Sequence, residues 1–198
     1  MSNLFHTLEY EAFRAGITPR TTQSREWFRN KMTTIKTINR NQLMKEEPII
    51  IKNRQVIGSM YMFFYDPKHK ATLPYYDSFP LVIVLKPAEG GFLGLNLHYL
   101  PPVLRAKFLD ALLEVTNNKR YDETTKFKLT YDALQRTAKM KYFKPCIKHY
   151  LTDHVRSRFA MVPAPEWEIA VFLPTADFNS QGKKYNINSV YADSRKMI

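Results

Sequence analysis

The feature that most limits how this chain can fold is a change in the spacing of its apolar residues. Within residues 58–98 they come in short β-branched and aromatic runs, bounded by Gly, Pro and Asp-Pro, which predicts strands. On both sides of this stretch they recur every three or four residues, which predicts helices. Short strands with bent connections favour a small, strongly curved barrel over a flat sheet. We therefore expect an α+β fold, a small β-barrel flanked by N- and C-terminal helices.

The expected elements follow from this pattern. Strands are predicted at residues 58–65, 79–85 and 92–98, with a fourth at 48–53. Helices are predicted at 3–14, after Thr21, after Pro101, and at 130–140, 145–159 and 187–197, while 166–173 fits either type. A chain of 198 residues without a long linker predicts one compact domain. Its expected parts are an N-terminal helical arm (1–47), a barrel core (48–100) and a C-terminal helical part packed on the barrel (101–198).

The charge of the chain is unusual, because 30 Lys and Arg against 18 Asp and Glu give a net charge of +12. Residues 119–158 hold eleven basic and four acidic residues, a net +7. Such a concentration suits an acidic partner, of which nucleic acid is the commonest. An acidic protein and a plain soluble surface remain alternatives. The candidate basic residues are Arg136, Lys139, Lys141, Lys144, Lys148, Arg156 and Arg158.

Aromatic residues are abundant, with 12 Tyr and 13 Phe, and they cluster between residues 61 and 79. Tyr75 and Tyr76 follow Pro74 and precede a predicted strand, so at least one ring is expected at the rim of the barrel. Three roles are open for these rings. They can fill the core, contact a protein partner, or stack on nucleobases.

The sequence lacks the motifs of common enzymes. It has no phosphate-binding G-x-x-x-x-G-K-[ST] loop and no G-x-G-x-x-G. Cys146 and two nearby histidines would spread over about 140° of a helix, too wide for one metal ion. Asp66-Pro67-Lys68 has the D-x-K spacing of some nucleases but fits a turn better. We therefore expect no enzyme activity, no catalytic residues, no cofactor and no metal.

Two further observations concern the location of the protein. The single cysteine cannot form an internal disulfide, which fits a reducing compartment. The longest apolar runs are much too short to cross a bilayer, so no membrane partner is expected.

Several segments resemble a known group of proteins. They are MYMFFYDPK at 60–68, LPYYDSFPL at 73–81, GFLGLNLHYLPP at 91–102, FKPCIKHYL at 143–151 and YADSRK at 191–196. These resemble virion proteins of large contractile-tailed bacteriophages and their cyanophage relatives, from about residue 5 to the end. The strand order and the prolines also resemble SH3-like barrels, a likeness of fold that carries no function.

The resemblance implies a non-enzymatic structural subunit of the phage tail, baseplate or neck, bound to other virion proteins. Its location would be the virion, after synthesis in the host cytoplasm. The N-terminal helices and residues 174–198 would be docking arms, while Tyr75, Tyr76 and the basic residues would meet acidic neighbours. The alternative is a basic phage protein that binds double-stranded DNA at genome ends or in the neck. The same lysines and arginines would then contact phosphates, with an affinity that falls as salt rises.

Overall fold

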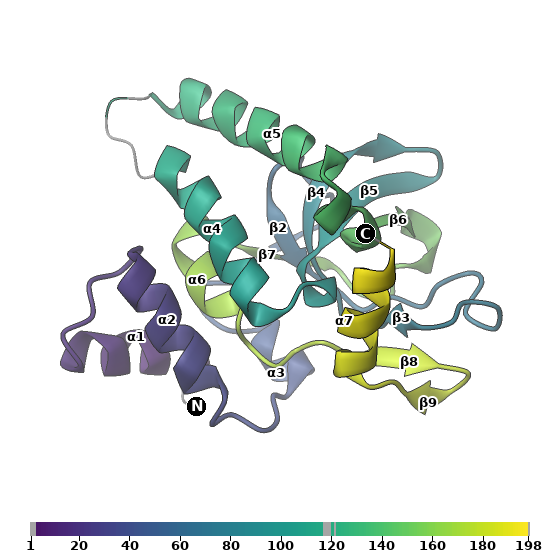
Figure 1. The fold of residues 1–198 in the computed structure, drawn as a ribbon, viewed down its shortest axis with the longest axis horizontal. Helices are drawn as coiled ribbons and strands as arrows, with labels where there is room; N and C mark the ends of the chain where they lie inside the picture. The colour runs from purple at the N-terminus through teal and green to yellow at the C-terminus, as the bar shows by residue number, and fades with distance from the viewer. Residues whose placement is uncertain (1–2, 117–119, 121, 198) are drawn as a thin grey trace.

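The computed structural model shows helices packed on one face of a six-stranded antiparallel sheet, with a small second sheet beside it (Figure 1). It describes residues 3–116, 120 and 122–197. The α-helices are α1 (Leu4–Arg14), α2 (Thr22–Met32), α3 (Arg40–Leu43), α4 (Pro102–Thr116), α5 (Glu123–Lys139), α6 (Trp167–Ala170) and α7 (Ile187–Lys196). The 3₁₀ helices are η1 (Leu97–Tyr99), η2 (Lys141–Cys146), η3 (Thr152–His154) and η4 (Ala164–Glu166).

The large sheet has the strand order β1-β7-β2-β4-β5-β6 and the small sheet the order β3-β8-β9. The strands are β1 (Ile50–Lys52), β2 (Met60–Met62), β3 (Tyr76–Asp77), β4 (Leu81–Ala88), β5 (Gly91–Asn96), β6 (Ile147–Leu151), β7 (Phe159–Val162), β8 (Phe178–Ser180) and β9 (Lys183–Lys184). Strands β4 and β5 form a hairpin. Strand β7 comes from late in the chain and lies between β1 and β2.

Alternation along the strands separates two sets of buried residues. Met60, Leu81 and Ile83 face the helices and belong to the main core. Tyr61 and Val82, which alternate with them, face the other way and join an aromatic cluster. This aromatic cluster consists of Tyr61, Phe63, Tyr65, Val82, Val84, Phe92, Tyr150 and Phe159. Because both faces of the sheet are covered, the central strands are apolar at nearly every position.

The aromatic cluster shows how strongly the sheet curves. Strand β7 is three strands away from β5, which in a flat sheet is about 14 Å. The ring centroids of Phe159 on β7 and Phe92 on β5 are only 6.0 Å apart. The sheet therefore curls around these rings, with Phe63 in contact with both of them.

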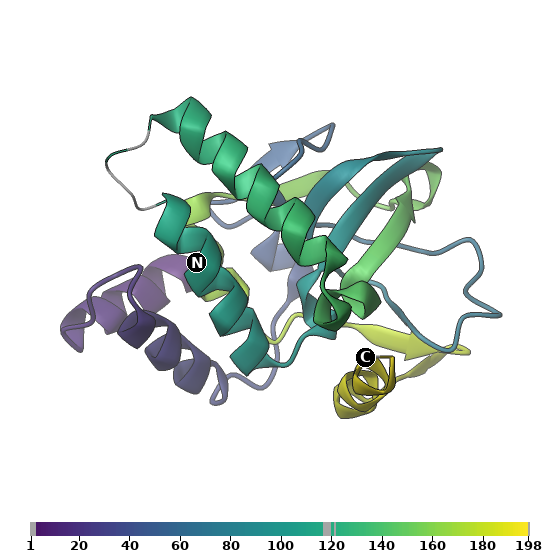
Figure 2. The ribbon, with the colours of Figure 1, turned by 45° about the horizontal axis from the view of Figure 1, so that its top comes forward.

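The helices begin where the sequence supplies capping side chains. The Asn3 side chain accepts a hydrogen bond from the backbone N–H of His6 at the start of α1. Thr21 and Ser24 form a reciprocal capping box at the start of α2. Helices α4 and α5 pack side by side, as both ribbon views show (Figure 2). None of the helices described is both long and apolar enough to span a membrane.

The mixed helix-and-sheet fold and most predicted elements are confirmed, including helices near 3–14, after Thr21, after Pro101 and at 187–197. The closed barrel is wrong. The described strands form open antiparallel sheets, and β1 and β6 remain the edges of the large one. The large sheet curls around the aromatic cluster, but the SH3-like detail is not confirmed.

The helix expected at 145–159 is also wrong. This segment contains η2, β6 and η3, with β6 paired to β5. Ile147, Leu151 and Val155 are four residues apart, a spacing that fits both a helical face and alternate positions of an extended chain. Gly91 favours the strand, because a residue without a side chain allows the β6 backbone to approach closely. A Cβ at position 91 would lie 1.9 Å from the Tyr150 carbonyl oxygen.

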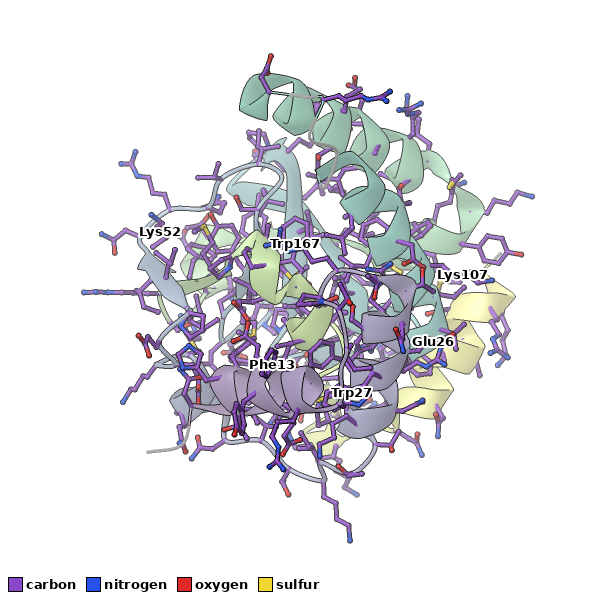
Figure 3. All side chains as sticks on the ribbon, turned by 90° about the vertical axis from the view of Figure 1, so that its left-hand side faces the viewer. Phe13, Glu26, Trp27, Lys52, Lys107 and Trp167 are labelled. Atoms are coloured by element: carbon purple, nitrogen blue, oxygen red, sulfur yellow. The ribbon has the colours of Figure 1, made fainter. Side chains whose placement is uncertain are left out.

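The terminal segments do not extend as docking arms. Phe5 on α1 and Phe28 on α2 are buried in the main core, and so is Val190 on α7. In Figure 3 the α1–α2 pair covers one side of the molecule, with Phe13 labelled on α1. These segments contribute core residues, which explains why they pack on the body of the protein.

Candidate functional site

A cavity of about 520 Å³ lies between the loop that precedes β3, η1 and the edge strand β6. Five tyrosines line it, and we call it the tyrosine pocket: Tyr65, Tyr75, Tyr76, Tyr99 and Tyr150. Its remaining polar lining consists of Lys68, His69, Lys148, His149 and Asp77. The pocket thus combines aromatic walls with four basic side chains.

The tyrosines are held in place by other rings. The Tyr75 ring stacks on Tyr185 at 4.9 Å between centroids and lies 6.0 Å from Tyr99. The Tyr150 ring stacks on Phe92 at 5.4 Å. Tyr76 is only half-buried and is the most accessible of the five rings. Tyr75 and Tyr76 therefore line the same cavity, but Tyr75 is buried and forms part of its wall.

Lys148 is the central cation of the pocket. Its Nζ lies 4.1 Å from the centroid of the Tyr99 ring, a cation–π geometry. The side chain is partly shielded from water, and this burial lowers the pKa of Lys148. Among the residues that the structure describes, no carboxylate forms an ion pair with it. A partly shielded cation without an anion has lost part of its hydration, so an anionic ligand would be favoured here.

A buried hydrogen-bond network supports the floor of the pocket. Asp77 Oδ1 accepts hydrogen bonds from the backbone N–H groups of Phe79 and Asp177, both at 3.1 Å. Its Oδ2 accepts from Asn96 Nδ2 at 3.0 Å and from His98 Nδ1 at 2.7 Å. These hydrogen bonds keep the pKa of the Asp77 carboxyl below its ordinary value despite burial. The carboxylate is thereby fully occupied.

His98 is the other titratable member of this network. Burial lowers its pKa, so the neutral imidazole donates its Nδ1–H to Asp77. Its Nε2 then accepts a hydrogen bond from the Thr175 hydroxyl at 3.1 Å. Carboxylate, imidazole and hydroxyl stand in the order of a hydrolase triad. Thr175 and His98 are both 0% exposed, however, so no substrate reaches the hydroxyl.

The predicted basic residues separate into groups. Arg136 and Lys139 lie in the last turn of α5, and Lys141 and Lys144 are exposed on η2, which leads directly into β6. Of the seven, Lys148 alone lines the tyrosine pocket.

The last two predicted basic residues lie on the segment that follows β6. The Arg156 guanidinium is 3.6 Å from the carboxylate of Asp66, next to the pocket wall, and Arg158 lies just before β7. Lys70 also pairs with Asp66 at 2.8 Å, so the carboxylate of the D-x-K motif is held by two cations. No group of three or more His, Cys, Asp or Glu in the described part of the chain could hold a metal ion.

Sequence reasoning missed Lys68, His69, Tyr99 and Tyr150 as lining residues. Lys68 and His69 belong to the turn after Asp66, and only the fold brings this turn to β6. The sequence around Tyr150 carried a usable signal, because an aromatic residue between His149 and Leu151 fits the alternation of a strand. Assigning a helix to 145–159 removed that signal.

The chain matches the sequence family described as "Phage T4 terminal DNA protecting protein" over residues 5–194. The chain belongs to this family. No curated protein and no solved structure shows a significant match to it. The expectation of a phage protein is thus confirmed at the level of a contractile-tailed phage family, while a specific virion structural family is not.

The family corrects the expected function. A tail, baseplate or neck structural subunit was the main interpretation, and it is wrong, because the family is one of proteins that protect terminal DNA. The alternative, a basic protein acting on DNA at genome ends, agrees with the family better. The basic charge and the aromatic residues fitted both interpretations, so composition could not separate them.

Proposed function

We propose that this protein binds the ends of linear double-stranded DNA of a phage genome and shields them from exonucleases. The observation that carries the proposal is the match of residues 5–194 to a terminal DNA protecting family. The net charge of +12 supports it, because duplex DNA presents two phosphates for each base pair. A protein that covers an end acts by occupancy, so we propose no catalytic activity.

The geometry favours the region around the tyrosine pocket as the DNA-contacting face. Lys68 and Lys148 line the pocket, and Lys141 and Lys144 lie on the segment that leads into β6. Cations supply affinity to phosphates without sequence preference, as a protein acting on any genome end requires. Tyr76 adds an accessible ring, which can stack on a base whatever its identity.

The test compares two forms of one DNA sequence. One is a linear duplex with open ends, and the other is the same duplex closed by a hairpin loop at each end. The protein should protect the open duplex from an exonuclease and bind it more tightly than the closed one. Binding should weaken steeply between 50 and 200 mM salt, by about 10³-fold if six phosphates are contacted.

Charge reversal supplies the matched variants. Lys148→Glu should abolish end protection, because it places an anion in the pocket. Lys52→Glu makes the same change on β1, at the opposite edge of the sheet, and should protect as the unchanged protein does. Equal binding to open and closed duplexes would refute the proposed function.

We also propose that the protein travels with the genome in the virion. The family is one of phage proteins, and a protein bound to genome ends would be packaged or retained with them. Mass spectrometry of purified virions, with and without nuclease treatment of disrupted particles, tests this. Absence of the protein from intact virions would contradict it.

A further inference from the structure

A DNA end differs chemically from the interior of a duplex in two ways. A terminal phosphate is a monoester with a charge between about −1.5 and −2, whereas an internal diester carries −1. The last base pair is stacked on one side only, so its bases separate more readily than internal ones. A protein that recognises ends as such can read the monoester, the loose base or both.

Lys148 is suited to the monoester. It is partly shielded from water, has no carboxylate partner among the described residues, and lies against the Tyr99 ring. A partly shielded lysine interacts more strongly with a dianion than with a singly charged diester, because the dianion carries the larger charge and solvent screens the pair less than in open water. Asp77, the carboxylate of the pocket lining, does not compete, since its two oxygens already accept four hydrogen bonds.

The walls and volume of the pocket suit one nucleotide. A cavity of about 520 Å³ lies within the range of about 300–1,000 Å³ that holds single small ligands. A base that enters such a pocket on its own has left its complement, as in enzymes that extract a base from the stack. Tyr76 offers the accessible ring on which such a base can stack.

We propose that the tyrosine pocket takes the last nucleotide of one DNA strand, unpaired from its complement, with its terminal phosphate monoester against Lys148. This inference rests on the proposed binding of DNA ends and adds the chemical group that is recognised. Either strand terminus can carry the monoester, and the two cases are separated by experiment.

The experiment measures the affinity of the full-length protein for four duplexes of one sequence at one salt concentration. They are closed by hairpin loops, open without terminal phosphates, open with 5′-phosphates, and open with 3′-phosphates. One of the two phosphorylated duplexes should bind about tenfold tighter than the unphosphorylated open one. The position of its phosphate shows whether the pocket takes the 5′ or the 3′ terminus. If all three open duplexes bind equally but more tightly than the closed one, end binding stands and this inference is wrong. If all four bind equally, end binding itself fails.

Variants locate the effect in the pocket. Lys148→Met keeps the length and packing of the side chain but not its charge, and should reduce the phosphate preference to less than twofold. Lys148→Arg should keep a preference, and Lys52→Met should leave it unchanged. A Lys148→Met protein with an unchanged melting temperature and an undiminished preference would overturn the assignment.

A terminal mismatch tests whether the last nucleotide is unpaired. Such a mismatch removes the need to open a base pair, so it should raise affinity about tenfold. In Tyr76→Leu, which lacks the accessible ring, the gain from the mismatch should become smaller because the freed base has lost its stacking partner. Equal affinity for matched and mismatched ends would show that the end binds as an intact pair, against the proposal.

Discussion

Phe63 is the residue on which the curvature of the sheet depends most directly. It is 0% exposed, and its ring lies between 5.2 and 6.2 Å from four other rings, those of Tyr65, Phe92, Tyr150 and Phe159. Replacing a buried Phe by Ala costs about 3–5 kcal/mol in free energy of unfolding. Edge-to-face pairs add about 0.5–1.5 kcal/mol each, although four pairs around one ring do not add fully. We therefore expect Phe63→Ala to cost about 4–6 kcal/mol.

The measurement is urea unfolding followed by the fluorescence of Trp27 and Trp167. Phe13→Ala is the matched control, because the same side chain is 78% exposed on α1 (Figure 3). It should change the free energy of unfolding by less than about 0.5 kcal/mol. Phe63→Leu, which keeps most of the volume, should cost about 1–3 kcal/mol and covers the case in which the Ala variant does not fold.

Two results would refute this reasoning. A cost below about 1.5 kcal/mol for Phe63→Ala would mean that the rings do not form a packed centre for the sheet. A Phe63→Leu protein as stable as the original would mean that volume alone, and not the arrangement of rings, stabilises the curvature. Because Tyr65 and Tyr150 also line the tyrosine pocket, a stability loss should be accompanied by weaker DNA-end binding.

Four other expectations concern single groups. Burial lowers the pKa of His98, so below about pH 6.5 the unfolded chain binds a proton there that the folded protein does not, and the protein loses stability as the pH falls. His98→Gln should make this loss smaller, by up to about 1.4 kcal/mol per pH unit. Urea unfolding from pH 7 to 5 measures it. The pH dependence from Glu166 has the opposite direction, because burial raises its pKa to about 7 and the folded state keeps the proton between about pH 4.5 and 7. Glu166→Gln should therefore stabilise the protein at pH 8 by at most about 3 kcal/mol and change its stability little at pH 4. Gly91→Ala should cost more than about 2 kcal/mol in thermal unfolding, because its Cβ would meet the β6 backbone, whereas Gly16→Ala, with open space but a φ of +71°, should cost about 1 kcal/mol. Burial raises the pKa of the Cys146 thiol to about 12, so a thiol reagent at pH 8 should label the folded protein far more slowly than the urea-unfolded chain.

Local patterns in the sequence predicted much of the fold. The alternation of Phe92, Gly94 and Asn96 with Leu93 and Leu95 indicated a strand, and β5 has those two faces. Such patterns act within a few residues, so they do not reveal which strands pair. The insertion of β7 between β1 and β2 depends on contacts between residues about 100 positions apart, and no short-range signal encodes it.

The candidate site was predicted less completely, for a similar reason. Tyr75, Tyr76 and Lys148 were singled out by composition and charge, and all three line one cavity. Lys68 and His69 looked like ordinary turn residues because nothing nearby in sequence marks them. The network of Asp77, Asn96 and His98 was not foreseen, since a buried carboxylate is recognisable only when its donors are known.

The position of β7 has a consequence for how the protein is made. Strands β1 and β2 leave the ribosome about 100 residues before the strand that joins them, which at ordinary translation rates is about 5–20 s. During that interval the two strands present unpaired backbone edges, and Ile50 and Ile51 add apolar surface. Nascent chains on neighbouring ribosomes of one messenger RNA can pair with each other through these exposed strand edges. A chaperone that covers this region during synthesis should therefore raise the yield of correctly folded protein.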